Sequence, residues 1–172
     1  MLTQTSAPDE DLMSLYQEIV LDHSKNSRNR GIVEDHTCIS EGRNPLCGDR
    51  VTVTASIDDS NIRDVRFDGK GCAISIASAS MMTESLVGLN RDQATQIFES
   101  VKSICTEDTA NSQRDSQISE ELNQRLEKLM ALSGVRKFPV RVKCATLPWY
   151  AFMSCLEGKS TATTEIASWP RP

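Results

Sequence analysis

Three cysteines stand where predicted elements of secondary structure begin or end. Cys47 precedes an alternating segment that is typical of a strand, Cys72 lies between the strands and a helix, and Cys144 lies at the predicted start of the last helix. Binding and catalytic sites are usually built at such junctions, where rigid elements position residues that solvent can still reach. We therefore expect the three thiols to share one site.

The residues beside these thiols indicate metal chemistry. Asp49 follows Cys47 with only Gly48 between them, so a thiol and a carboxylate can turn toward one ion while the glycine bends the backbone. Gly71 stands directly before Cys72 in a similar arrangement. Three thiolates and one carboxylate form a donor set for zinc or for an iron–sulfur cluster.

The position of Cys144 predicts an activated thiol. Cys144 is expected near a helix N-terminus and follows Arg141, so the helix dipole and the nearby cation should both favour its thiolate. The intervals are long, however: 25 positions from Cys47 to Cys72, and 72 from there to Cys144. Zinc fingers space their ligands in compact pairs, and cysteines are also common packing residues. Spacing alone leaves metal binding and structural cysteines equally open.

The composition is that of one soluble domain with a hydrophobic core. The chain has 172 residues, of which 38% are hydrophobic and 25% charged, enough for one domain and too few for two. Its net charge of -5 is a poor match for a phosphate backbone, so nucleic acid is not an expected partner. The sequence shows no signal segment and no membrane span. We therefore expect a cytoplasmic protein, whose cysteines are thiols, metal ligands or redox groups rather than a disulfide frame.

The predicted elements must bring these junctions together. An amphipathic helix is expected from Asp9, a strand hairpin over 50–57 and 62–67, a third strand near 31–39, and helices after Cys72, after Asn90, over 118–132 and from near Cys144. Pro148 then fits only if it lies in the first turn of the last helix. This order predicts an α+β fold in which helices cover one face of a small antiparallel three-stranded sheet. We expect one domain over 1–172, with an ordered core over about 9–157, tails at 1–8 and 158–172, and a mobile loop at 106–117.

Four short sequence segments carry a resemblance that covers about Leu15 to Leu156. They resemble, in order and in combination, the iron–sulfur scaffold family of the IscU, NifU and SufU type: Asp22-His23-Ser24 with Arg28-Asn29-Arg30-Gly31, Asn44-Pro45-Leu46-Cys47-Gly48-Asp49, Gly69-Lys70-Gly71-Cys72-Ala73-Ile74-Ser75, and Arg141-Val142-Lys143-Cys144-Ala145-Thr146-Leu147. Two features are similar to the SufU branch. Arg141 and Lys143 stand where the IscU branch has a histidine before its last cysteine, and the interval from Cys72 to Cys144 is longer than in IscU proteins. The resemblance thus places the loop and helix around 106–132 in a SufU-like insertion.

The resemblance implies a SufU/IscU-like fold and a role in iron–sulfur cluster assembly. Carried over to this sequence, it implies zinc bound by Cys47, Asp49, Cys72 and Cys144, with Cys47 accepting persulfide sulfur and Arg141 supporting it. The implied activity is that of a zinc-dependent sulfurtransferase. Its partner would be a SufS-like cysteine desulfurase that carries pyridoxal phosphate, and the chain would act as a monomer upstream of other iron–sulfur assembly proteins.

Two alternatives stay open at this point. In one, the same four residues hold a [2Fe-2S] cluster that is assembled on the chain and passed to apo-proteins. In the other, zinc is purely structural, and its removal unfolds the domain.

The remaining cysteines and a histidine have simpler interpretations. Cys38, Cys105 and Cys155 match no ligand position of the family and are expected to be small packing residues, with a resolving thiol as the less favoured role for Cys155. His23 lies on the apolar side of the first helix and is expected to be packed and hydrogen-bonded rather than a ligand.

Overall fold

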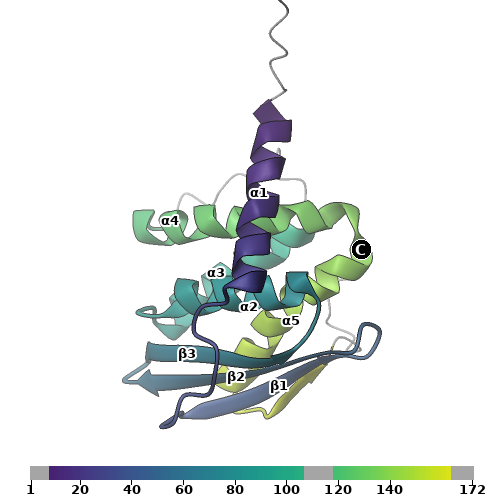
Figure 1. The fold of residues 1–172 in the computed structure, drawn as a ribbon. Coiled ribbons are helices and arrows are strands. Elements are labelled where there is room, and N and C mark those ends of the chain that lie inside the picture. The colour runs from purple at the N-terminus through teal and green to yellow at the C-terminus, as the bar shows by residue number, and fades with distance from the viewer. Residues whose placement is uncertain (1–7, 107–117, 164–172) are drawn as a thin grey trace, which may run out of the picture.

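The helices cover one face of a twisted sheet (Figure 1). The computed structural model describes residues 8–106 and 118–163. Its strands are β1 (Cys38–Asn44), β2 (Asp49–Asp58), β3 (Asn61–Lys70) and β4 (Thr161–Thr163), in the order β3-β2-β1-β4. Its helices are α1 (Pro8–Lys25), α2 (Ala73–Leu86), α3 (Arg91–Thr106), α4 (Glu120–Leu129), the 3-10 helix η1 (Met130–Lys137) and α5 (Pro139–Leu156). The α+β class and the placement of the helices on one face of the sheet are as predicted.

The predicted hairpin is confirmed. Val51, Val53 and Ala55 of β2 are fully buried. Because alternate residues of a strand share one side of the sheet, these three side chains all face the helices. The two strands pair from Asp58 opposite Asn61. The connecting residues have positive φ angles, as a tight hairpin turn requires.

The rest of the sheet differs from the prediction. The third strand is β1 at 38–44 rather than near 31–39, and it pairs antiparallel with β2. A fourth strand, β4, comes from the segment predicted as a tail and pairs parallel with β1. The sheet is therefore four-stranded and mixed. A three-residue edge strand carries too little periodicity to be recognised from sequence, because its pairing partner decides its conformation.

The last helix also begins earlier than expected. α5 starts at Pro139, which occupies the first turn, where its missing N–H has no helical partner to lose. Pro148 consequently lies inside the helix, and the prediction that it belongs to the first turn is wrong. A proline inside a helix leaves the carbonyl groups of the preceding turn short of donors. The carbonyl that loses its helical donor is that of Cys144, four positions before Pro148. The next carbonyl, that of Ala145, accepts a hydrogen bond from the Ser78 hydroxyl of α2.

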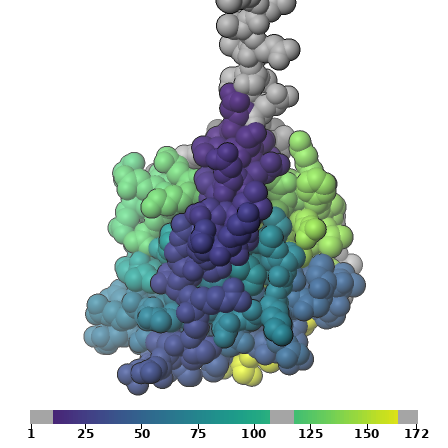
Figure 2. Space-filling view, in the orientation of Figure 1, coloured from purple at the N-terminus to yellow at the C-terminus, as the bar shows by residue number. Residues whose placement is uncertain are grey.

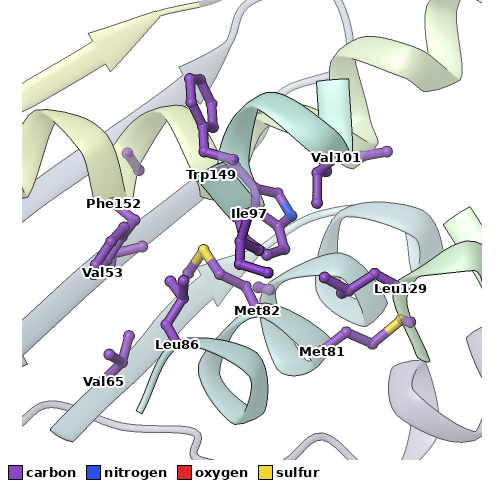
Figure 3. Close-up of a cluster of buried hydrophobic side chains, with 14 of the residues drawn as sticks. Val53, Val65, Met81, Met82, Leu86, Ile97, Val101, Leu129, Trp149 and Phe152 are labelled. Atoms are coloured by element: carbon purple, nitrogen blue, oxygen red, sulfur yellow. The ribbon is translucent and has the colours of Figure 1, made fainter. Parts of the chain in front are cut away.

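The core lies between α2, α5 and the sheet. Figure 3 shows side chains from the sheet meeting those of the helices. The indole of Trp149 is fully buried, and its Nε1 donates to the Ser78 hydroxyl at 3.0 Å. Most of α2 is buried, with serine and alanine at many positions, so small side chains allow close packing on both sides. The elements that carry Cys72 and Cys144 therefore rest on one rigid core.

Helix α1 lies across the front of this layer (Figure 2). It contacts α2 and η1, yet Leu12, Leu15 and Leu21 remain 44–50% exposed. Within the described residues, no helix is both long enough and apolar enough to cross a membrane. Of the predicted tails and mobile loop, residues 1–7, 107–117 and 164–172 lie outside the described residues, whereas Pro8 and Thr106 belong to α1 and α3.

Cys38 and Cys155 form a disulfide, contrary to the expectation that both are separate packing residues. Their Cα atoms lie 5.2 Å apart, and 117 positions separate them in sequence. Cys38 opens β1, and Cys155 is in the last turn of α5. Packing of this helix on the sheet brings the two thiols together. The local sequence around each cysteine does not predict this contact. Cys105 is buried with a free thiol, as predicted, and burial raises its pKa to about 12.

Candidate metal centre

Cys47 and Asp49 come from the turn that joins β1 to β2. The backbone N–H groups of Cys47 and Gly48 donate to the carbonyl of Asn44 at 3.3 and 2.8 Å. Gly48 has a φ of 71°, a conformation that favours glycine. This turn leaves Cys47 exposed, while Asp49 at the start of β2 is 3% exposed. A solvent-facing thiol and a buried carboxylate thus stand side by side.

Cys72 is the residue that precedes α2. It takes the N-cap position with an extended backbone, and its N–H donates to Asp49 Oδ1 at 3.0 Å. Its Sγ lies 3.7 Å from the other carboxylate oxygen, Oδ2. Asp49 therefore connects the turn after β1 to the beginning of α2.

Cys144 completes the group from α5. Its side chain is fully buried, and its Sγ lies 3.8 Å from the Sγ of Cys47. Ligand atoms of Cys47, Asp49 and Cys144 all lie within 4.8 Å of one another. Cys72 contacts one member of this group, Asp49, through the bond above, and the Cys144 thiol acts on the pKa of Cys72. All four predicted ligands are thus brought to one place, with three in a tight cluster and Cys72 at its side.

The electrostatics of the thiols differ from the prediction. A hydrogen bond from the Cys144 thiol, with further support from backbone N–H groups of α2, lowers the pKa of Cys72 to about 6. The same hydrogen bond, burial and the charges of Cys72 and Asp49 raise the pKa of Cys144. The prediction of a favoured Cys144 thiolate at a helix N-terminus is therefore wrong, because Pro139 and not Cys144 begins α5. Proline at a first helical position was the available sequence signal.

The residues present fit a metal ion. The donor set of soft sulfur and one hard oxygen suits zinc or iron. The Ser75 hydroxyl is buried beside it without a hydrogen-bond partner among the described residues. A Cβ added to Gly71 would lie 3.1 Å from that hydroxyl and 3.2 Å from Asp49 Oδ1. The absence of a side chain at Gly71 thus leaves space beside the Ser75 hydroxyl and the Asp49 carboxylate.

Arg141 and His23, which the sequence also singled out, lie outside this group. Arg141 is exposed in the first turn of α5. It lines an apolar groove of about 1120 Å³ formed mainly by α1, η1 and the start of α2. His23 is packed and hydrogen-bonded as predicted: its Nδ1 lies 2.8 Å from the Ser80 hydroxyl, and burial lowers its pKa.

Sequence reasoning missed two polar residues of the centre, Asn44 and Ser75. Asn44 is 1% exposed and Ser75 is fully buried. The Asn-Pro pair at 44–45 is a turn signal and could have indicated that Asn44 organises the loop. Ser75 offered no comparable signal, because serines recur along α2.

Comparisons with known proteins agree with this geometry. The family model of the NifU-like N terminal domain matches residues 15–144. The zinc-dependent sulfurtransferase SufU of Bacillus subtilis is 39% identical over 141 residues, which cover 82% of this chain and 88% of that protein. The iron-sulfur cluster assembly scaffold protein IscU of Streptococcus pyogenes is 33% identical over 151 residues, 88% of each chain.

A solved structure supports the same assignment. A SUF-system protein of Fervidobacterium islandicum, described as an iron-sulfur cluster assembly scaffold, superposes with a TM-score of 0.69 at 30% identity, covering 83% of this chain and 97% of that one. Sequence, fold and the clustered Cys47, Asp49 and Cys144 thus agree. The chain belongs to the IscU/NifU family of iron–sulfur cluster assembly scaffolds, whose shared unit is the NifU-like N-terminal domain.

Proposed function

We propose that this chain is a zinc-dependent sulfurtransferase that takes persulfide sulfur from a cysteine desulfurase onto Cys47. The observation that carries the proposal is the contrast between the exposed Cys47 and its buried neighbours Asp49 and Cys144. The Cys47 thiol can meet a partner while Asp49 and Cys144 stay inside. The 39% identity to a protein named as a zinc-dependent sulfurtransferase points the same way.

Zinc would be held by Cys47, Asp49, Cys72 and Cys144, and would keep bound thiols deprotonated at neutral pH. Asp49 is the hardest donor of this set and the one least suited to a soft site. Its carboxylate is held by the Cys72 N–H, so Asp49 keeps its place when Cys47 leaves the group. The buried Cys144 stays out of reach of a partner's sulfur.

The sulfur-transfer step is a thiol–persulfide exchange. The Cys47 thiolate attacks the outer sulfur of the persulfide on the desulfurase, and a new S–S bond forms. The S–S bond of the partner breaks, and its cysteine leaves as a thiolate. No electrons are gained or lost overall, so the reaction needs neither an oxidant nor a reductant. Pyridoxal phosphate, which mobilises the sulfur, would belong to the partner.

Exposed apolar side chains beside Cys47 support docking of another protein. Leu46 is 68% exposed, and Phe138 and Val140 at the start of α5 are 60% and 57% exposed. Exposed apolar groups gathered at a site typically mark a protein interface. Arg141 directly follows Val140 and adds a positive charge that can steer and orient an acidic partner. We assign the chain this role as a single-domain monomer of the cytoplasm.

A second candidate function rests on the same donors. The four ligands could hold a [2Fe-2S] cluster during its assembly for delivery to downstream proteins. The 33% identity to an IscU scaffold favours this alternative. The two functions differ in what must be present: sulfur transfer requires no iron, and cluster assembly does.

The test is transfer of labelled sulfur from cysteine by a cognate desulfurase to the zinc-loaded chain, with iron excluded. We expect persulfide on the wild type and none on Cys47→Ala. Cys105→Ala is the matched control, because it removes a free thiol outside the centre. No labelled persulfide on the wild type, together with a cluster formed on anaerobic addition of iron and sulfide, would replace the proposal with the scaffold function.

A further inference from the structure

We propose that Asn44 is a positioning residue of the metal centre, which holds the Cys47 turn with its amide oxygen and the Cys144 sulfur with its amide nitrogen. The inference rests on the proposed function and deepens it. It explains how one buried side chain separates the roles of two thiols that lie 3.8 Å apart. Asn44 is not itself a ligand and acts through the two cysteines.

The contacts of Asn44 point in two directions. Its Oδ1 accepts the N–H of Leu46 at 3.3 Å, and its backbone carbonyl accepts the N–H groups of Cys47 and Gly48. Its Nδ2 lies 3.9 Å from the Sγ of Cys144, within reach of an N–H···S hydrogen bond. Asn44 is the last residue of β1, and Cys144 lies in α5, 100 positions away. The side chain therefore connects the turn that carries the exposed Cys47 to the buried Cys144.

The chemical consequence follows from the charge on sulfur. A hydrogen bond to a thiolate stabilises its negative charge and makes it a weaker nucleophile, while it fixes the direction in which the sulfur points. Cys144, which receives this bond, is fully buried, whereas Cys47 is exposed. Asn44 thus keeps Cys144 as the permanent ligand and leaves Cys47 as the thiol that accepts sulfur.

Two substitutions separate the amide oxygen from the amide nitrogen. Asn44→Asp keeps the shape and the acceptor for the Leu46 N–H, but replaces the donor with a negative oxygen facing the Cys144 sulfur. Asn44→Ser keeps a short acceptor for the turn and removes the amide N–H donor that reaches Cys144, without adding charge. Ser40→Ala is the matched control, because it deletes a buried polar group on the same face of β1 without altering the centre.

The experiment measures zinc affinity by competition with a chromophoric chelator, together with the absorption of the Co²⁺-substituted protein. Loss of a partner that orients a ligand typically costs about 10- to 100-fold in metal affinity. We expect such a loss for Asn44→Asp, a smaller loss for Asn44→Ser, and none for Ser40→Ala. The thiolate-to-cobalt charge-transfer band should move to longer wavelength in both Asn44 variants, because an unbonded thiolate gives up charge more readily.

The outcomes separate the two proposals. Wild-type zinc affinity and an unshifted cobalt band in folded Asn44→Asp and Asn44→Ser would overturn the role of Asn44 and leave the zinc site intact. A general loss of stability without a band shift would also overturn it, since a purely structural residue behaves in that way. A wild-type chain that binds neither Zn²⁺ nor Co²⁺ would refute the zinc-dependent function itself, and the role of Asn44 with it.

Discussion

The backbone N–H of Cys72 donates to the carboxylate of Asp49 at 3.0 Å across 23 positions of sequence. This single bond joins the start of β2 to the start of α2. It uses one of the N–H groups that a helix N-terminus leaves without a partner. The bond thereby fixes the orientation of Asp49 at the buried side of the centre.

A side chain at position 71 should crowd the junction between Asp49 and α2. In Gly71→Ala the new Cβ would stand just over 3 Å from both the Ser75 hydroxyl and Asp49 Oδ1. We expect zinc affinity to fall by about 10-fold or more, as for other residues that orient ligands, with the fold retained. Chelator competition and circular dichroism measure the two effects.

Gly134→Ala is the control for that substitution. Its Cβ would lie 3.4 Å from the flexible end of Met13, and it belongs to η1, which carries none of the four ligands. Unchanged zinc affinity in Gly71→Ala, or an equal loss in Gly134→Ala, would show that the space beside Asp49 is not required.

The stability of the metal-free protein should rise with pH between about 6 and 9. The pKa of Cys72 is lowered from 9.0 to about 6, so within this window the unfolded chain holds a proton that the folded chain has lost. Stability therefore increases with pH up to 9 and is lost as the pH falls through about 6. The raised pKa of Cys144 acts with the opposite sign only above 9.

Urea unfolding of the metal-free chain at several pH values tests this dependence. Cys72→Ser lacks the titrating thiol and should flatten the profile over the same range. A wild-type profile no steeper than that of Cys72→Ser would mean that the Cys72 thiol is not perturbed in the folded state.

The Cys38–Cys155 disulfide should contribute strongly to stability. It closes a loop of 117 positions. A cross-link of this length lowers the conformational entropy of the unfolded chain, which raises the free energy of unfolding by about 4 to 5 kcal/mol. We expect reduction to lower the free energy of unfolding by about 2 to 5 kcal/mol. The double variant Cys38→Ser/Cys155→Ser should have a lower free energy of unfolding than the wild type, and reductant should not change it.

Thiol counting gives an independent measurement of the same bond. The chain has 6 cysteines, of which 4 are free in the structure. Denatured, unreduced protein should therefore titrate 4 thiols, and reduced protein 6. Six thiols without reduction would exclude the disulfide.

Ser78 should be the most costly serine of α2 to remove. Its hydroxyl accepts from Trp149 Nε1 and donates to the Ala145 carbonyl near Pro148. Ser78→Ala removes the hydrogen-bond partner of two buried polar groups, Trp149 Nε1 and the Ala145 carbonyl. Each such loss lowers the free energy of unfolding by about 1 to 3 kcal/mol. Ser85→Ala is the control, because the Ser85 hydroxyl bonds only a carbonyl of its own helix. Equal losses in urea unfolding would contradict the importance of the link between α2 and α5.

The sequence by itself determined the class of fold, the hairpin of β2 and β3, and the identity of the candidate ligands. Periodicity of two is a local property, so Val51, Val53 and Ala55 indicated their strand without knowledge of the partner. The segments around Cys47, Cys72 and Cys144 indicated the family because residue types at a metal site are constrained by its chemistry.

Only the tertiary structure decided which side chains face one another. The contact between Asn44 and Cys144, the disulfide between Cys38 and Cys155, and the parallel pairing of β4 with β1 each join segments separated by long stretches of chain. The direction of the Cys144 pKa shift likewise depends on burial and on Cys72 beside it. These features arise when α5 packs on the sheet, because packing sets distances between residues that local sequence preferences leave undetermined.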